Sequence, residues 1–213
     1  MTSPPILPQP LQTDLISKTV RFDGFYRLVE YQLRHQLYDG SWSPVLSREV
    51  LQTLDSAAVL LFDPHLEQVI LVEQFRSGHF AHGDQAPWSL EIVAGRIPAD
   101  QSPADTARRE ALEEAGVQIA DLKEIGIWAP SPGQASERVH VYLGLVALDP
   151  GMGHGGLVHE HEDIRIVRMG LQDALAQLDR MGSLVTATAL IWLDREILKG
   201  APGYRDRGQR NKE

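Results

Sequence analysis

The sequence predicts an α+β fold in which a mixed β-sheet carries helices on its faces and follows an antiparallel β-unit at the N-terminus. Extended apolar runs outnumber helical patterns, and the three helical patterns are spaced irregularly among them. Regular alternation of strands and helices would instead predict a doubly wound parallel sheet. The 213 residues, with an apolar fraction of 43%, suffice for one sizeable hydrophobic core.

The N-terminal part is predicted to contain an arm and an antiparallel unit. The chain opens with a proline-rich stretch, which we expect to be poorly ordered. Between Phe25 and Leu37 apolar residues fall largely on alternate positions, and Asp39-Gly40 supplies a hairpin turn before another extended run. We assign residues 1–53 to this unit.

The larger domain is assigned to residues 54–200, and residues 201–213, rich in glycine and charge, are expected to form a flexible tail. Helical spacing predicts one helix that Ser102 caps and Gly116 ends, and a last helix between Ser183 and Gly200. A further helical pattern covers 171–178. Apolar runs predict strands at 57–63, 68–75, 88–95, 121–129, 138–148 and 163–169.

The composition excludes several classes of function. No run is long and apolar enough to span a bilayer, and no signal peptide is recognisable, so we expect a cytoplasmic protein without a membrane partner. Without cysteine there is no disulfide, thiolate metal site or thiol nucleophile. The formal charge of −9 argues against nucleic acid as a partner. A phosphate-bearing ligand is therefore expected to bind together with a metal ion.

Three carboxylates crowd one part of the first predicted helix. Glu110 is a helical neighbour of both Glu113 and Glu114, and like charges at this spacing destabilise an isolated helix. One interpretation is a solvated face whose charge Arg108 and Arg109 partly neutralise. The other is a divalent-cation site, because Mg2+ binds one or two carboxylates together with water and substrate phosphates.

The residues around this helix resemble the Nudix box. The pattern requires Gly, five residues, Glu, seven residues, then Arg-Glu-aliphatic-any-Glu-Glu-any-Gly-aliphatic. The chain departs from it at Gln101, where the pattern has its first Glu. It matches at Gly95, Arg109, Glu110, Ala111, Glu113, Glu114, Gly116 and Val117.

This resemblance implies roles for individual residues. Glu110 and Glu114 are implied as metal ligands, together with the carbonyl oxygen of Ala94. Arg109 is implied as a structural partner of Glu113, although a ligand role for Glu113 stays open. We count Glu114 and Arg109 among the catalytic residues.

Further segments resemble bacterial ADP-ribose pyrophosphatases of this family, over roughly residues 24–193. These segments are "PWSLEIVAG", "SPGQASE" and "EHEDIRI", and Pro132 lies sixteen residues beyond Gly116. The resemblance implies a Nudix-type α/β/α sandwich with a mixed β-sheet. It also implies hydrolysis of ADP-ribose to AMP and ribose 5-phosphate with Mg2+, for which Mn2+ can substitute.

The general base is expected from the acidic loop at residues 155–164, whose alternative interpretation is a flexible surface loop. The resemblance places the base at Glu160 and a further metal contact at Glu162, but the two could exchange roles. A loop of this kind would position the base after substrate and metal bind. The histidines His154, His159 and His161 are close enough in sequence to suggest zinc, yet we interpret them as incidental.

Substrate contacts are predicted outside the box. Arg76, at the end of a strand, is the first candidate for the diphosphate. Phe25 is the candidate stacking partner of the substrate's nucleobase. The resemblance places Phe25 in a unit that is exchanged across a homodimer, with Arg48 reaching the partner's site. Ordinary strand burial of Phe25 and a solvated edge charge at Arg48 are the alternatives. Glu137 would either touch the second ribose or orient its loop.

Two other functions remain open at this point. The nearest is hydrolysis of another nucleoside diphosphate sugar. The second is a catalytically idle relative that binds a nucleotide or a protein, which the amide of Gln101 in the box allows. The retained carboxylates Glu110, Glu114, Glu160 and Glu162 argue against it.

Overall fold

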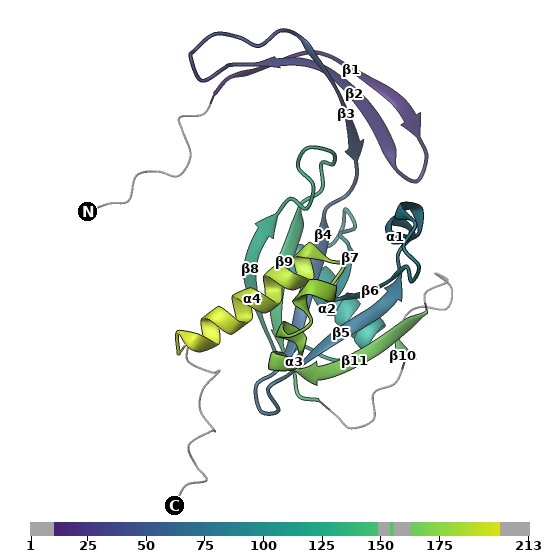
Figure 1. The fold of residues 1–213 in the computed structure, drawn as a ribbon, viewed down its shortest axis with the longest axis vertical. Coiled ribbons are helices and arrows are strands. Elements are labelled where there is room, and N and C mark those ends of the chain that lie inside the picture. The colour runs from purple at the N-terminus through teal and green to yellow at the C-terminus, as the bar shows by residue number, and fades with distance from the viewer. Residues whose placement is uncertain (1–10, 149–153, 156–162, 201–213) are drawn as a thin grey trace, which may run out of the picture. The chain divides into compact units, whose positions relative to one another are not determined.

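The computed structural model describes residues 11–148, 154–155 and 163–200, the pair 154–155 by its backbone only (Figure 1). The chain divides into two compact units. One unit contains the residues up to Thr53 together with Ser131–Glu137, and the other contains Leu54–Pro130 and the residues from Arg138 onward. The proline-rich opening, residues 1–10, and the expected tail at 201–213 lie outside the described residues.

The first unit is a sheet of three strands, and its antiparallel pairing is as expected. Its strands β1 (Thr13–Asp23), β2 (Arg27–His35) and β3 (Leu46–Gln52) are adjacent in that order. The segment Ser131–Glu137 bonds to the end of β3, where the Leu51 N–H donates to the Gln134 carbonyl oxygen over 2.8 Å. Gly40 lies in the turn after β2 with a positive φ of 86°, which agrees with the turn predicted at Asp39-Gly40.

The first strand of this unit was missed by the sequence analysis. Its pairing with β2 shifts register between Leu15 and Ser17 and again between Val20 and Phe22. Each irregularity breaks the alternation of side chains between the two faces, so the period of two that identifies a strand is lost.

The second unit is built on a mixed sheet, which confirms the predicted class. Its described strands follow the order β10-β11-β5-β4-β9-β8, with β6 beside β5 and β7 beside β4. Strand β4 pairs with β9 in parallel, and the other pairs are antiparallel. The strands are β4 (Ser56–Asp63), β5 (Gln68–Phe75), β6 (Trp88–Glu91), β7 (Val93–Arg96), β8 (Asp121–Trp128), β9 (Val139–Leu145), β10 (His154–Gly155) and β11 (Ile164–Gly170).

The single strand expected at 88–95 is two strands, so that prediction was wrong. Strand β6 pairs with β5, whereas β7 pairs with β4. At the junction the N–H of buried Ile92 donates to the Thr186 hydroxyl, 3.0 Å away on helix α4. A side-chain acceptor from a distant helix thus replaces a ladder bond at the point where the chain changes partners. Sequence continuity of the apolar run gave no sign of this.

The helices are α1 (Ser77–His82), α2 (Pro103–Ala115), α3 (Leu171–Leu175) and α4 (Leu184–Leu198). Helix α1 was not predicted, because none of its residues is buried and it therefore has no apolar periodicity. The Ser102 hydroxyl caps α2 by accepting from the Asp105 N–H, and Gly116 ends it at φ 66°, both as predicted. Within the described residues, no helix combines the length and apolar character needed to cross a membrane.

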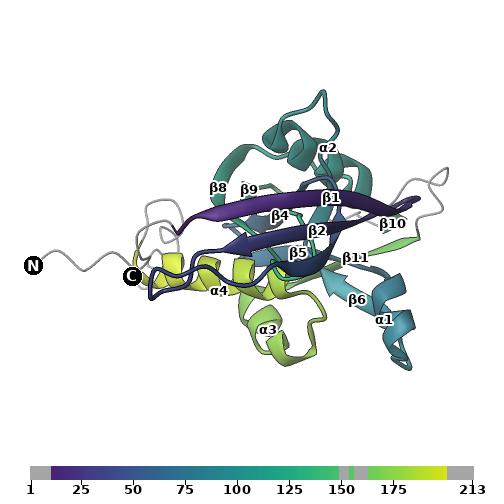
Figure 2. The same ribbon diagram turned by 90° about the horizontal axis from the view of Figure 1, so that it is seen from above.

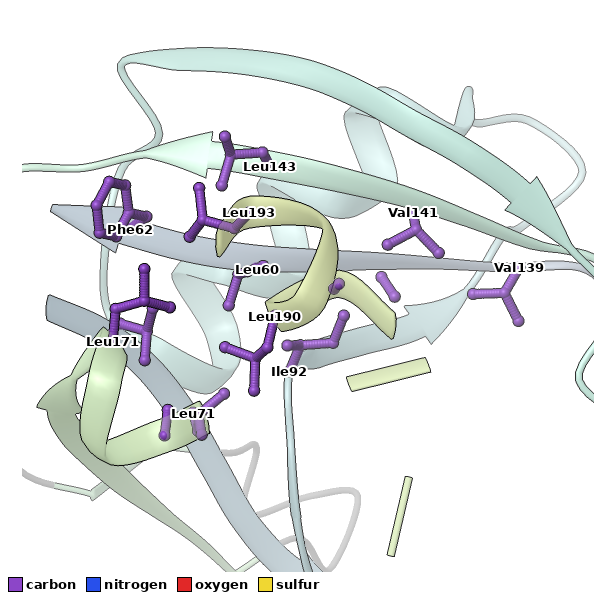
Figure 3. Close-up of a cluster of buried hydrophobic side chains, with 14 residues drawn as sticks. Leu60, Phe62, Leu71, Ile92, Val139, Val141, Leu143, Leu171, Leu190 and Leu193 are labelled. Carbon is purple, nitrogen blue, oxygen red and sulfur yellow. The ribbon is translucent and has the colours of Figure 1, made fainter. Parts of the chain in front are cut away.

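Helices cover both faces of this sheet, which confirms the predicted sandwich. Helix α2 lies on one face, where the small side chains of Ala107, Ala111 and Ala115 are fully buried. Helices α3 and α4 lie on the other face (Figure 2). Their core contains Leu60, Phe62, Leu71, Ile92, Val139, Val141, Leu143, Leu171, Leu190 and Leu193 (Figure 3).

A buried carboxylate holds the end of β4. Asp63 is only 3% exposed. Its Oδ1 accepts from the N–H groups of His65 at 2.7 Å and Leu66 at 3.1 Å, and its Oδ2 accepts from Leu148 at 2.9 Å. Burial by itself raises the pKa of the Asp63 carboxyl, but these three bonds outweigh it and lower the pKa below its ordinary value.

This arrangement predicts a pH-dependent contribution to stability. Because the folded-state pKa of Asp63 is lowered, its contribution is complete above the unfolded pKa of about 3.9 and is lost as the pH falls through the folded value. Asp63→Asn should lower the free energy of unfolding at pH 7 by about 1–3 kcal/mol. Urea unfolding should show this difference shrinking at pH 3. Asp121→Asn, at an exposed position of β8, is the control, and a pH-independent difference would contradict the assignment.

Candidate active site

The loop and helix after β7 place a carboxylate directly against a glycine. A Cβ atom built at Gly95 would lie 1.7 Å from Glu110 Oε1 and 2.2 Å from its Cδ. A side chain here would force Glu110 to move, because real Cβ contacts are essentially never shorter than 3.0 Å. The Gly of the box therefore leaves the space that the Glu110 carboxylate occupies, and is not needed for an unusual φ.

Glu114 lies beside the same strand. Its side chain is buried, with 3% of the residue exposed, and its Oε2 accepts from the Ala94 N–H over 3.3 Å. The helical pattern had suggested that all three carboxylates lie opposite the small apolar side chains of the helix, and for Glu114 this was wrong. The position lies next to buried Ala115 and faces β7, so the backbone of that strand supplies a polar partner that the helical pattern does not show.

Arg109 joins the other two carboxylates of the box. Its Nη2 donates to Glu110 Oε1 over 2.8 Å, and its Nη1 donates to Glu113 Oε2. Partial burial lowers the pKa of the guanidinium, but the charges of Glu110 and Glu113 and their hydrogen bonds outweigh it and raise the pKa. The structure thus shows the expected pairing of Arg109 with Glu113, and adds a second ion pair with Glu110.

Gln101, the departure from the box, also contacts this arginine. Its Oε1 accepts from Arg109 Nε over 3.2 Å and from the Thr106 hydroxyl over 3.2 Å. Thr106 is completely buried in helix α2. Neither contact was predicted from the sequence, although the Thr106 hydroxyl, five residues after the amide on the first turn of the helix, was a usable signal.

The oxygen atoms that helix α2 and strand β7 offer here are of the kind that a hard divalent cation binds. Glu110 is held against Gly95, Glu114 is hydrogen-bonded to the backbone of Ala94, and the carbonyl of Ala94 belongs to the same peptide segment. Within the described part of the chain, no group of three His, Asp or Glu side chains could hold a metal by itself. Two carboxylates and a carbonyl agree with the sites of Mg2+, which water and substrate phosphates complete.

Arg76, the candidate for the diphosphate, is held by a carboxylate. Its Nε donates to both oxygens of Glu91, and its Nη2 donates to Glu91 Oε2 over 2.6 Å. The Glu91 side chain is largely buried, whereas that of Arg76 is 41% exposed. This bidentate pair fixes the guanidinium at the junction of β5 and α1. Glu91 had been missed, although it lies in the segment "PWSLEIVAG" that the sequence analysis had singled out.

Three predicted substrate contacts lie in the first unit. Phe25 is in the connection between β1 and β2, is 80% exposed and meets Tyr26 edge to face. Its alternative interpretation, burial within a strand, is therefore wrong for this chain. Arg48 is exposed on β3 and donates to the Ser47 carbonyl oxygen. Glu137 is half-buried at the end of the segment Ser131–Glu137.

The predicted base and the histidines belong to a segment whose side chains are not described. Glu160, Glu162, His159 and His161 lie outside the described residues, and His154 is described only by its backbone in β10. Their predicted roles stay predictions.

The geometry of strand β7 and helix α2 agrees with the comparisons with known proteins. A model of the NUDIX domain matches residues 52–186. The chain belongs to the Nudix family. An ADP-ribose pyrophosphatase of Escherichia coli is 35% identical to this Nudix hydrolase over 182 residues, which are 84% of this chain and 87% of the relative.

Other relatives cover similar shares of this Nudix hydrolase. An ADP-ribose pyrophosphatase of Haemophilus influenzae is 37% identical over 156 residues, 72% of this chain and 71% of that protein. A GDP-mannose pyrophosphatase of Pectobacterium atrosepticum is 28% identical over 187 residues, 88% and 95% of the two chains. The crystal structure of an ADP compounds hydrolase has the same fold, with a TM-score of 0.67 at 19% identity, over 93% of this chain and 100% of that one.

Proposed function

We propose that this Nudix hydrolase cleaves the diphosphate of ADP-ribose with Mg2+, giving AMP and ribose 5-phosphate, and that Mn2+ can substitute. The observation that carries the proposal is that two carboxylates of α2 lie against β7, Glu110 at Gly95 and Glu114 at the Ala94 N–H. The relatives named ADP-ribose pyrophosphatase, at 35% and 37% identity, support the choice of substrate.

The reaction adds water to one phosphorus and breaks the bridging phosphorus–oxygen bond. In such a reaction a divalent cation neutralises charge on the diphosphate and activates the attacking water. The ligands proposed for it are Glu110, Glu114 and the Ala94 carbonyl, with Glu162 as a further ligand. Arg109 orients Glu110 through their ion pair. Glu160 accepts the proton of the attacking water.

Four residues are proposed as substrate contacts. Arg76, exposed although paired with Glu91, would bind a phosphate oxygen. Phe25, which is 80% exposed, would stack on the nucleobase, in this chain or in a partner. Arg48 would reach the site of the partner, and Glu137 would contact the second ribose.

A second substrate class is supported by one observation. The GDP-mannose pyrophosphatase of Pectobacterium atrosepticum matches over 88% of this chain, although its identity of 28% is lower. Hydrolysis of another nucleoside diphosphate sugar is therefore the alternative.

Both possibilities can be tested with one panel. The purified protein would be incubated with ADP-ribose, GDP-mannose and other diphosphate sugars in Mg2+, and the products identified by chromatography. We expect AMP from ADP-ribose at the highest kcat/KM, and loss of turnover in excess chelator. Faster cleavage of GDP-mannose would favour the alternative, and full turnover in chelator would exclude the metal site.

The base assignment predicts a difference between two neighbouring carboxylates. Glu160→Gln should lower kcat by about 10²–10⁴-fold with little change in substrate affinity, because a general base acts in the transition state. Added Mg2+ should not restore the rate. Glu162→Gln should instead weaken metal activation, and added Mg2+ should restore part of the rate. If these two behaviours are exchanged in steady-state kinetics, the base is Glu162.

The first unit predicts a homodimer. Strand β1 is an edge of its sheet among the described residues, and apolar side chains such as Leu15, Val20 and Phe22 on it are exposed. An exposed apolar edge strand favours association. Light scattering should therefore give twice the mass of 23.7 kDa. A monomer with undiminished activity would contradict both the dimer and a site shared between copies.

A further inference from the structure

Gln101 has an amide where the signature of the family has a carboxylate, and it contacts the arginine of the box. The three donor nitrogens of Arg109 reach three acceptors, the Nε reaching Gln101 Oε1 and the two terminal nitrogens reaching Glu110 and Glu113. A guanidinium is planar, so fixing its Nε also fixes the directions of the two terminal groups.

The amide oxygen is itself held in place. The Thr106 hydroxyl donates to it over 3.2 Å, and Thr106 is completely buried on the first turns of α2. A buried hydroxyl that lost this acceptor would carry a desolvation cost. The chain of contacts therefore runs from the helix interior, through Gln101 and Arg109, to the carboxylate of Glu110.

We propose that Gln101 is a positioning residue that orients Glu110 in the metal site through Arg109. Because Gln101 replaces a glutamate of the family signature, the metal site has one negative charge fewer than that signature would give it. This inference rests on the proposed metal site and goes beyond it in stating what sets its affinity. The amide supplies the hydrogen-bond acceptor that the arginine needs. Because the amide is neutral, the cation experiences less attraction than a carboxylate at this position would provide.

Two substitutions separate the two parts of the proposal. Gln101→Met keeps the length and the neutral charge but removes the acceptor, so it should weaken Mn2+ binding by about tenfold or more, as is usual when a group that orients a ligand is lost. Gln101→Glu restores the acceptor and adds a charge, so it should tighten binding. That gain should shrink as salt is added, because salt screens exposed and partly exposed charges.

The experiment is a titration of the metal-free full-length protein with Mn2+, followed by electron paramagnetic resonance of the free ion. This readout needs neither substrate nor turnover. Gln118, exposed just beyond the same helix, offers matched controls, and Gln118→Met and Gln118→Glu should bind Mn2+ like the wild type. Thermal unfolding without metal shows whether each variant is folded.

A double-mutant cycle tests the contact with the helix interior. Thr106→Val should weaken Mn2+ binding in the wild type but should have little further effect in the Gln101→Met background, because the bond it removes is already gone. Independent effects of the two substitutions would contradict the chain of contacts.

The outcomes distinguish this inference from the proposed function. Wild-type affinity in folded Gln101→Met would overturn the positioning role while leaving the metal site in place. Looser binding by Gln101→Glu at low salt would overturn the charge argument. Absence of Mn2+ binding by the wild type itself would overturn the metal site and this inference together.

Discussion

Replacement of Glu114 by glutamine is expected to lower kcat/KM by about 10³-fold at Mg2+ levels that saturate the wild type, because a metal ligand supports several kcal/mol of transition-state stabilisation. Glu114 is buried, and its Oε2 bonds to the backbone of β7 beside the proposed carbonyl ligand. The amide would keep the shape of the side chain but lose its negative charge. Steady-state kinetics over a range of Mg2+ concentrations would measure the loss.

Glu113 offers the matched control on the same helix. Glu113→Gln removes the charge of one partner of Arg109, but the guanidinium keeps Glu110 and Gln101 as partners. Its loss of activity should therefore stay within about tenfold. Equal losses for the two variants would show that Glu113 is a ligand as well, an alternative that the box pattern leaves open.

Gly95→Ala is expected to lower activity by more than about 10²-fold while leaving the protein folded. The added Cβ would lie 1.7 Å from Glu110 Oε1, so the carboxylate must move by more than 1 Å. Misplacement on this scale costs about 10²-fold in rate. Because the displaced atoms are the far end of a flexible side chain, we expect only a modest change in the thermal unfolding midpoint. Kinetics and thermal unfolding measured together would separate the two effects.

Gly78→Ala is the control for this substitution. A Cβ atom at Gly78 meets nothing within 4 Å, and the residue lies in α1, where alanine is tolerated. Activity of Gly95→Ala near that of Gly78→Ala would mean that Glu110 does not need its present position, and would remove Glu110 from the metal site.

Local patterns predicted much of the fold. The cap at Ser102, the end of α2 at Gly116 and the strand β5 at 68–75 appear where the sequence placed them. Such features depend on neighbouring residues, so the chain itself carries the signal. Strand β1 and helix α1 were missed, because bulges or full exposure remove the periodicity that identifies an element.

Within the candidate site, contacts between residues of one helix were predictable, whereas contacts between different elements were not. The spacing of the box predicted that Glu110, Glu114 and Arg109 belong to one site, since residues on one helix have fixed offsets, and their roles stay predictions. It could not show that Glu91 holds Arg76, because Glu91 lies on β6 and Arg76 directly follows β5, and the pairing of these two strands is decided by the sheet.

By itself, the sequence determined which carboxylates share one helix, where that helix begins and ends, and that a glycine precedes it. Tertiary structure alone decided that Glu114 is buried against the Ala94 N–H and that Gln101 joins Thr106 to Arg109. It also decided that the run 88–95 divides between two partner strands. The physical reason is that hydrogen-bond partners and burial depend on segments brought together by folding, whereas helix periodicity and capping act within a few residues of the chain.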